Sequence, residues 1–171
     1  MLKIAYAPNY HHPLPEGHRF PMEKYSLVPQ QLLYEGSCTE ENFFEPEKPE
    51  MEDILAVHSE EYVNDLLQLQ LDKRAVRKMG FPLSVGLVQR ELHIVQGTLQ
   101  NTEYALQYGI SINVAGGTHH AYPDHGEGFC LLNDQAIAAK YLLNKYSRGD
   151  IKVPQQVRHD NVLSKKTLKR F

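Results

Sequence analysis

Two adjacent histidines, His119 and His120, are the residues of this chain whose types and spacing best suit chemistry. An imidazole titrates near neutral pH, so one ring can act as a general base while the other gives electrostatic support or acts as an acid. Because neighbouring side chains diverge, we do not expect both rings to bind one metal ion. The alternative is a solvated loop rich in histidine and glycine, which a short motif alone does not exclude.

The residues around this pair predict a loop at the end of a strand. Residues 110–115 form an apolar, β-branched run that indicates a buried strand, and two glycines follow it directly. Open α/β sheets bind their ligands at the carboxyl ends of strands. Gly126 and Gly128 permit a tight, exposed loop whose backbone approaches a substrate, with Phe129 as an apolar wall.

Helical and extended patterns alternate along the chain. Apolar residues at intervals of three and four predict a long helix over about residues 84–108, which Gly109 ends. Asn133 and Asp134 are interpreted as caps of a later helix. Three more elements are expected: a strand in residues 1–7, either a kinked helix or two short helices over 21–34 because Pro29 lies inside, and an amphipathic helix that Ser59 caps. The pattern predicts an α/β fold with a partial parallel sheet flanked by helices.

Composition excludes several classes of function. The chain has 171 residues, 42% hydrophobic content and a net charge of -3, which predicts one domain with a core and gives no electrostatic case for nucleic acid. No apolar run is long enough for a signal peptide or a membrane span, so we expect a cytoplasmic protein that does not bind membranes. Cys38 and Cys130 lack the spacing of a disulfide scaffold or a thiol zinc site.

A set of motifs resembles the signature of the zinc-dependent histone deacetylase superfamily, nearest to its class IV type and to bacterial deacetylases and acetoin-utilisation proteins. The signature is carried by Gly-Gly-Thr-His-His-Ala at 116–121, Gly-Phe-Cys at 128–130 and Asn-Asp at 133–134. Supporting matches lie at 6–10, 18–24, 53–58 and Tyr62. The resemblance covers residues 1–146 and implies the first half of the arginase/deacetylase fold.

The resemblance also implies roles for four residues of the loop. His120 would be the general base and His119 its partner, while Gly128 and Phe129 would line the channel for the acylated lysine. The family's zinc polarises the amide carbonyl and acidifies the attacking water. The implied substrate is an acylated lysine or a related acylated amine.

Three residues outside the loop are also assigned by the resemblance. Lys24 would lie near the channel through which the acetate product leaves, although a surface lysine is an equal alternative. His58 is interpreted as structural, because it falls between two helical segments. Phe81 is a candidate for the rim that meets the substrate.

The chain departs from the family after Tyr146. The resembling enzymes continue with Asp-x-Asp-x-His, which supplies zinc ligands, whereas this chain has Gln155, Val157 and His159 at the aligned positions. We therefore divide it into a deacetylase-like region, residues 1–146, and a divergent basic tail, residues 147–171. We expect no metal ligands, no zinc held by this chain alone and no useful hydrolysis of acetyl-lysine, because a catalytic zinc needs three protein ligands.

Three hypotheses about function remain open at this point. The first is the amino-terminal part of a deacetylase-like hydrolase, and the second is a non-catalytic module that binds acylated amines. The third is a thiol hydrolase that uses Cys130 with His120. In addition, a partial sheet should expose an apolar edge near residues 110–114, which predicts association with a partner.

Overall fold

The computed structural model describes residues 1–146, and the tail with Gln155, Val157 and His159 lies outside the described residues. Three parallel strands form the described sheet in the order β2-β1-β3: β1 (Lys3–Ala5), β2 (Phe43–Phe44) and β3 (Ser111–Asn113). Ile4 of β1 pairs with Phe43 on one side and with Ile112 on the other. The predicted α/β class with a partial parallel sheet is therefore confirmed.

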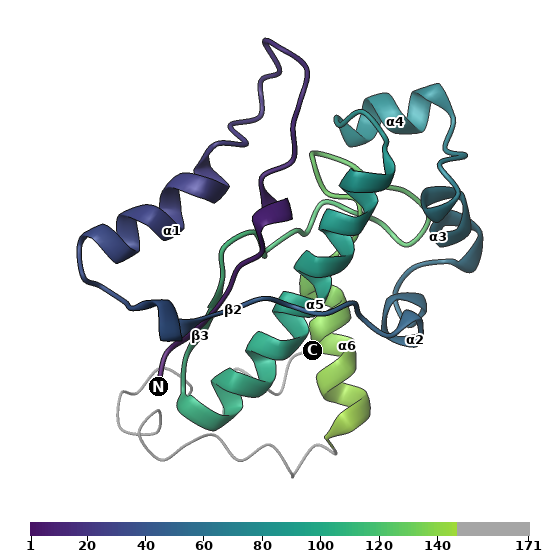
Figure 1. The fold of residues 1–171 in the computed structure, drawn as a ribbon. Coiled ribbons are helices and arrows are strands. Elements are labelled where there is room, and N and C mark those ends of the chain that lie inside the picture. The colour runs from purple at the N-terminus through teal and green to yellow at the C-terminus, as the bar shows by residue number, and fades with distance from the viewer. Residues whose placement is uncertain (147–171) are drawn as a thin grey trace.

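Helices surround this sheet, and the longest of them is the predicted one (Figure 1). The helices of residues 1–146 are α1 (Lys24–Tyr34), α2 (Met51–Leu55), α3 (Glu60–Leu67), α4 (Lys73–Met79), α5 (Val85–Tyr108) and α6 (Asp134–Lys145), with 3-10 turns η1 (Pro8–Tyr10) and η2 (Glu40–Asn42). Ser84 caps the start of α5 and Gly109 ends it in a left-handed conformation, as expected. Pro29 lies inside α1 without ending it.

Helix α5 is the central element of the described chain. In Figure 1 it runs through the middle of the molecule beside α6, with α1 on the left of the view and α2, α3 and α4 on the right. Its Gly97 allows the helix to lie directly on the sheet. A Cβ atom there would be 2.7 Å from the hydroxyl of Tyr10 and 2.8 Å from the amide nitrogen of Asn113. A larger side chain at this position would therefore push α5 away from the sheet.

Strand β3 differs from the buried strand that we predicted. Its polar residues face α5: the hydroxyl of Ser111 donates to the side-chain oxygen of Asn101, and the amide of Asn113 donates to the backbone oxygen of Ile94. Because strand side chains alternate between faces, Ile112 points the other way, and it is 42% exposed. Ile110, just before the strand, is 58% exposed. β3 is an edge strand of the described sheet, so the prediction of burial was wrong.

A charged pair lies inside the core between α5 and η1. Arg90 and Glu91 are 2% and 1% exposed, and their side chains form an ion pair. Arg90 also donates to the backbone oxygen of Tyr10 at 2.7 Å and lies 4.7 Å from the ring centre of Tyr25. Burial raises the pKa of Glu91, and the guanidinium of Arg90 opposes that rise. This pair holds the amino-terminal segment against α5.

No helix within residues 1–146 is both long enough and apolar enough to span a bilayer.

Candidate functional site

The candidate site is the segment between β3 and α6, residues 114–133, which we call the site loop. It begins where β3 ends, at the carboxyl end of a parallel strand, as the sequence predicted. His119 and His120 are both exposed on it. The loop therefore presents two imidazoles at the edge of the sheet where ligands of α/β proteins bind.

The two imidazole rings lie close together. Their centres are 4.2 Å apart with an angle of 37° between the ring planes, so the expectation that the side chains diverge was wrong. Nδ1 of His119 is 2.8 Å from the backbone oxygen of Gly117 and must donate to it, which leaves Nε2 free to accept a proton. The ring of His120 covers Gly128, where a Cβ atom would be only 3.2 Å from Cγ of His120. Two of the predicted site residues, His120 and Gly128, are thus in direct contact.

The carboxylate of Asp134 anchors the start of the site loop. Its fully buried carboxylate accepts hydrogen bonds from the backbone N–H of Gly117 and from the hydroxyls of Thr118 and Thr98. Asn133 is the residue that caps α6, through a bond from the N–H of Ala136. The prediction of a cap was therefore right for Asn133 and incomplete for Asp134, whose main contacts are with the loop.

His58 anchors the far end of the site loop. It is buried between α2 and α3, its Nδ1 donates to the backbone oxygen of Tyr122 at 2.9 Å, and its Nε2 accepts from the N–H of Asn133 at 3.0 Å. Both ring nitrogens are therefore engaged in the neutral form. Burial lowers the pKa of His58 below its ordinary value of 6.5. The structural role that we predicted for His58 is confirmed.

This arrangement predicts a pH dependence of stability. The unfolded chain protonates His58 near its ordinary pKa of 6.5, whereas the folded chain does so only at lower pH. The stabilisation is complete above the unfolded value and is lost as pH falls through the lowered folded value. We expect urea unfolding between about pH 7.5 and 5.5 to show a falling free energy of unfolding, and a shallower fall in His58→Gln.

The control for this experiment is His11→Gln, because His11 is exposed and contacts only a serine hydroxyl among the described residues. Burial also lowers the pKa of His12 and His93, so part of the pH dependence should remain in every variant. An identical pH dependence in His58→Gln and in the unmodified chain would contradict the prediction.

Phe129, the predicted apolar wall, follows the glycine that the ring of His120 covers, and it is not among the residues that line the hollow at the imidazole pair. Gly128 and Phe129 both have positive φ angles, 56° and 66°, which for Phe129 is a strained conformation. The end of α4 holds them: the N–H of Phe129 donates to the backbone oxygen of Met79 at 2.8 Å. The Phe129 ring packs against Phe20 and Phe81, with ring centres 5.0 and 5.1 Å away. Phe81 is buried, so its predicted place on the rim was wrong.

Gly80, which ends α4, lies directly against the ring of Phe129. A Cβ atom on Gly80 would be 2.9 Å from the Phe129 ring, and the φ angle of Gly80 is +91°. We expect Gly80→Ala to lower the free energy of unfolding by about 2 to 3 kcal/mol and to move the ring. Gly36→Ala is the control, because Gly36 has a φ angle of +67° but open space around it.

Gly36→Ala should cost about 1 to 2 kcal/mol from backbone strain alone. Urea unfolding measures both costs, and aromatic proton shifts report the position of Phe129. If both substitutions lowered the free energy of unfolding equally and left the aromatic proton shifts of Phe129 unchanged, Gly80 would not position the ring of Phe129.

Two cations lie near this wall. Lys24 places its ammonium 4.7 Å from the ring centre of Phe20. Phe20 in turn packs against Phe129, the predicted wall, so Lys24 is connected to that wall through Phe20. Lys24 is not among the residues that line the hollow at the imidazole pair. The guanidinium of Arg19 lies 4.8 Å from the centre of the Phe129 ring itself. Sequence reasoning gave Arg19 no role, although Arg19 lies within the matched motif at residues 18–24.

The imidazoles open onto a hollow of about 400 Å³. It is lined by His119, His120, Ala121, Tyr122, Pro123, Glu127 and Asn133. Lys78 lies 3.0 Å from the carboxylate of Glu127 and lowers its pKa, so Glu127 is ionised at neutral pH. The exposed ring of Tyr122 stacks on His125, with ring centres 4.6 Å apart. A carboxylate and an aromatic face thus stand beside the imidazole pair.

Cys130 does not have the environment of a nucleophile. It is buried, and burial raises the pKa of its thiol. A reactive cysteine needs an accessible thiolate. The structure therefore opposes the hypothesis of a thiol hydrolase.

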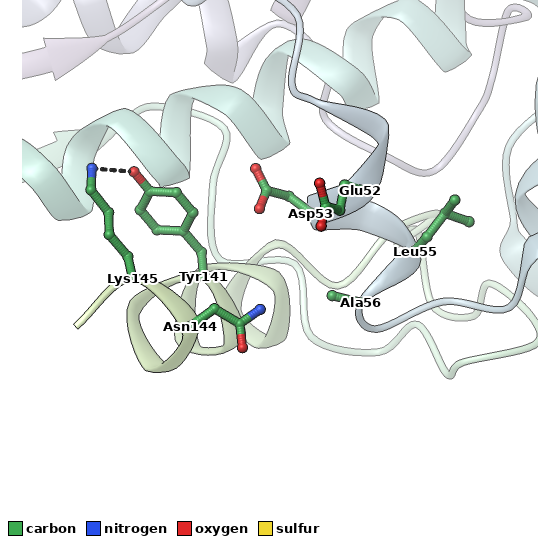
Figure 2. Close-up of a pocket in the computed structure, with 7 residues that line it drawn as sticks. All are labelled: Glu52, Asp53, Leu55, Ala56, Tyr141, Asn144 and Lys145. Atoms are coloured by element: carbon green, nitrogen blue, oxygen red, sulfur yellow. Dashed lines mark hydrogen bonds between the residues drawn. The ribbon is translucent and has the colours of Figure 1, made fainter. Parts of the chain in front are cut away.

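A second hollow, of about 630 Å³, lies between α2 and α6 (Figure 2). Figure 2 shows Asp53 of α2 across from Tyr141 and Lys145 of α6. The ammonium of Lys145 donates a hydrogen bond to the hydroxyl of Tyr141 and forms an ion pair with Glu103 at 2.9 Å. The described residues that line this hollow include no imidazole and no thiol, so we assign it no chemistry.

Comparison with known proteins agrees with this geometry. Residues 18–153 match the histone deacetylase domain. The chain belongs to the histone deacetylase domain family. A protein of Picosynechococcus is 44% identical over 137 residues, which are 80% of this chain and 46% of that protein. A probable deacetylase of Archaeoglobus fulgidus is 32% identical over 128 residues, which are 72% of this chain and 35% of the relative.

Solved structures show the same relationship. A histone deacetylase (HDAC) homologue from Aquifex aeolicus superimposes with a TM-score of 0.69 and 25% identity, over 84% of this chain and 41% of that one. An HDAC homologue complexed with SAHA gives a TM-score of 0.72 with the same identity and coverage. The chain therefore spans less than half the length of these relatives, and the predicted resemblance to part of the deacetylase fold is confirmed.

The histone deacetylase family is zinc-dependent, so the described residues can be tested as zinc ligands. Within residues 1–146 no three side chains of His, Cys, Asp or Glu gather closely enough to hold a metal ion. The carboxylate of Asp134 already accepts three hydrogen bonds, from Gly117 and Thr118 of the site loop and from Thr98 of α5. Residues 1–146 therefore do not fit a zinc ion by themselves.

Proposed function

We propose that this chain supplies the imidazole-bearing part of a deacetylase site and is inactive on its own. The reaction would be the zinc-dependent hydrolysis of acetyl-lysine or a related acylated amine. The observation that carries the proposal is the His119–His120 pair, held beside Phe129 on a loop that Asp134 and His58 anchor. Membership of the histone deacetylase family supports the class of reaction.

This proposal gives a role to four residues of the site loop and to Lys24 of α1. His120 is the general base, and His119 is its partner, with the tautomer of His119 set by the backbone oxygen of Gly117. Gly128 leaves space for the ring of His120, and Phe129 lines the channel for the acyl chain. Lys24 acts indirectly, through Phe20 and the wall, near the path of the acetate product.

The hollow already has a cation beside its carboxylate and its aromatic ring. The ammonium of Lys78 lies 3.0 Å from the carboxylate of Glu127 and 5.8 Å from the ring centre of Tyr122. An acylated amine is a neutral amide at the acylated nitrogen, so these groups impose no requirement for a charged substrate. We further propose a cytoplasmic location, which the free cysteines Cys38 and Cys130 support.

The proposal is tested by measuring zinc content and acetyl-lysine hydrolysis on the purified chain at neutral pH. We expect neither stoichiometric zinc nor hydrolysis above background, because the described residues supply fewer than the three ligands of a catalytic zinc. Tightly bound zinc at one equivalent together with amide cleavage would contradict the inactivity of the isolated chain.

A non-catalytic module that binds acylated amines is the second candidate. The hollow of about 400 Å³ beside Tyr122 favours it, because this pocket is formed by residues of the chain alone. Calorimetry with an acetyl-lysine peptide and with the same peptide unacetylated separates the two candidates. Saturable binding of the acetylated peptide that His120→Ala abolishes would favour the binding module, and absence of heat would count against it.

A further inference from the structure

Residues 122–127 of the site loop, which we call the loop tip, form one edge of the hollow at the imidazole pair. The first and last of them, Tyr122 and Glu127, both line that hollow. Helix α4 lies alongside, and the N–H of Phe129, just beyond the loop tip, donates to the backbone oxygen of Met79 in the last turn of α4 (Figure 1). Side chains of α4 that reach the loop tip therefore help to set the shape of the hollow.

One side chain of α4, that of Lys78, contacts the loop tip at three residues. Its ammonium lies 3.0 Å from the carboxylate of Glu127, 2.9 Å from Nε2 of His125 and 5.8 Å from the ring centre of Tyr122. The two rings also stack on each other, with centres 4.6 Å apart and an angle of 10° between their planes. These three contacts, which we call the Lys78 latch, connect α4 to both ends of the loop tip.

The hydrogen bond between Lys78 and His125 defines the protonation state of the imidazole. An ammonium group has three N–H donors and no acceptor, so Nε2 of His125 must accept and carries no proton. The ring proton is then on Nδ1, which donates to the carboxylate of Asp124 at 2.6 Å. The Lys78 latch therefore requires a neutral His125.

Protonation of His125 breaks this contact. The added proton occupies Nε2, so that nitrogen no longer accepts, and two cations would be 2.9 Å apart. The other charged or titratable groups of the described residues that contact His125 belong to the loop tip: Tyr122, Asp124 and Glu127. The carboxylate of Glu127 lies 3.8 Å from Nε2. The imidazolium and Lys78 therefore compete for Glu127, and the bond that joins the His125 ring to α4 is lost.

We propose that Lys78 is a positioning residue of the candidate site, which holds the loop tip on α4 while His125 is neutral and releases it when His125 is protonated. The side chain of His125 is 30% exposed, so protons reach it in the folded chain. Exposed ion pairs stabilise a fold little, so the Lys78 latch acts on the position of the loop tip rather than on the free energy of unfolding. The inference rests on the proposed function in one respect, because the hollow is where that function places the substrate.

Nuclear Overhauser effects between the ε-methylene protons of Lys78 and the ring protons of His125 measure the Lys78 latch in the full chain. We expect them at about pH 7.5 and expect their loss at about pH 5.5, where the imidazole gains its second proton. Over the same range the backbone amide resonances of Tyr122 and Glu127 should shift, because the loop tip moves.

Three variants separate the Lys78 latch from the other imidazoles of the chain. Lys78→Met at about pH 7.5 should place the amide resonances of the loop tip where the unmodified chain has them at about pH 5.5. His125→Gln keeps an acceptor for Lys78 but gains no proton in this range, so it should abolish most of the pH-dependent shift. Lys73→Met is the matched control, because Lys73 is an exposed lysine in the first turn of α4, and it should leave these resonances unchanged.

Circular dichroism checks that the three variants remain folded. Persistence at about pH 5.5 of the Overhauser effects between Lys78 and His125 would overturn the proposal. Loop-tip resonances that Lys78→Met leaves in place, or that still shift fully with pH in His125→Gln, would overturn it as well.

These measurements need neither zinc nor a substrate, so they separate this inference from the proposed function. Stoichiometric zinc and amide cleavage by the isolated chain would overturn the proposed function and leave the Lys78 latch standing. Absence of the Lys78 latch would leave the proposed roles of His119 and His120 standing.

Discussion

Arg90→Met should lower the free energy of unfolding by about 3 to 5 kcal/mol, the largest effect that we expect from a single substitution. The carboxylate of Glu91 is buried beside it and would lose its only described charged partner. The backbone oxygen of Tyr10 would lose a hydrogen-bond donor as well. Urea unfolding followed by circular dichroism measures the change.

Two further variants test this explanation. Arg90→Met combined with Glu91→Leu should recover most of the lost stability, because the double variant removes both charges of this pair and leaves neither of them unpaired. Lys145→Met removes the exposed ion pair with Glu103 and should cost less than about 1 kcal/mol. A cost for Arg90→Met no greater than that of Lys145→Met would show that the buried pair does not stabilise the fold.

Asp134→Ala should lower the free energy of unfolding by about 2 to 4 kcal/mol, because three donors would lose a buried acceptor. These donors are the N–H of Gly117 and the hydroxyls of Thr118 and Thr98. The substitution also frees the start of the site loop, so the ring resonances of His119 and His120 should shift and broaden. Urea unfolding and imidazole proton spectra test the two parts.

Asp134→Asn keeps one acceptor oxygen and should cost less than Asp134→Ala. Ser59→Ala is the reference substitution, because it removes a single capping hydrogen bond from the N–H of Tyr62. It should lower the free energy of unfolding by about 1 kcal/mol. If Asp134→Ala cost no more than Ser59→Ala and left the imidazole resonances unchanged, Asp134 would not be an anchor of the site loop.

The helices could be predicted from the sequence because their signals are local. The three- and four-residue spacing within α5, with Ser84 before it and Gly109 after it, defines that helix without reference to the rest of the chain. The burial of β3 could not be predicted in this way. A strand of three residues is too short for its alternation to show which face is covered, and the covering helix is known only from the fold.

The position of the imidazole pair was also predictable, because a strand followed by glycines places His119 and His120 at the end of the sheet. Their contacts were not predictable. His58 reaches Asn133 across 75 residues of chain, and Arg19 reaches the ring of Phe129 across a longer interval. The rule that adjacent side chains diverge holds for extended backbone, and the turn that brings His119 onto the backbone oxygen of Gly117 breaks it.

The order of the strands has a consequence for how the chain folds. β1 is the first element, but the bond between Ser111 and the backbone of Lys3 spans 108 residues, so β1 cannot join β3 until the chain has been synthesised beyond β3. Closing such a long loop costs entropy before any contact is gained, which slows folding. We expect α5 to form first as a template, with the imidazole-bearing segment reaching its final conformation last.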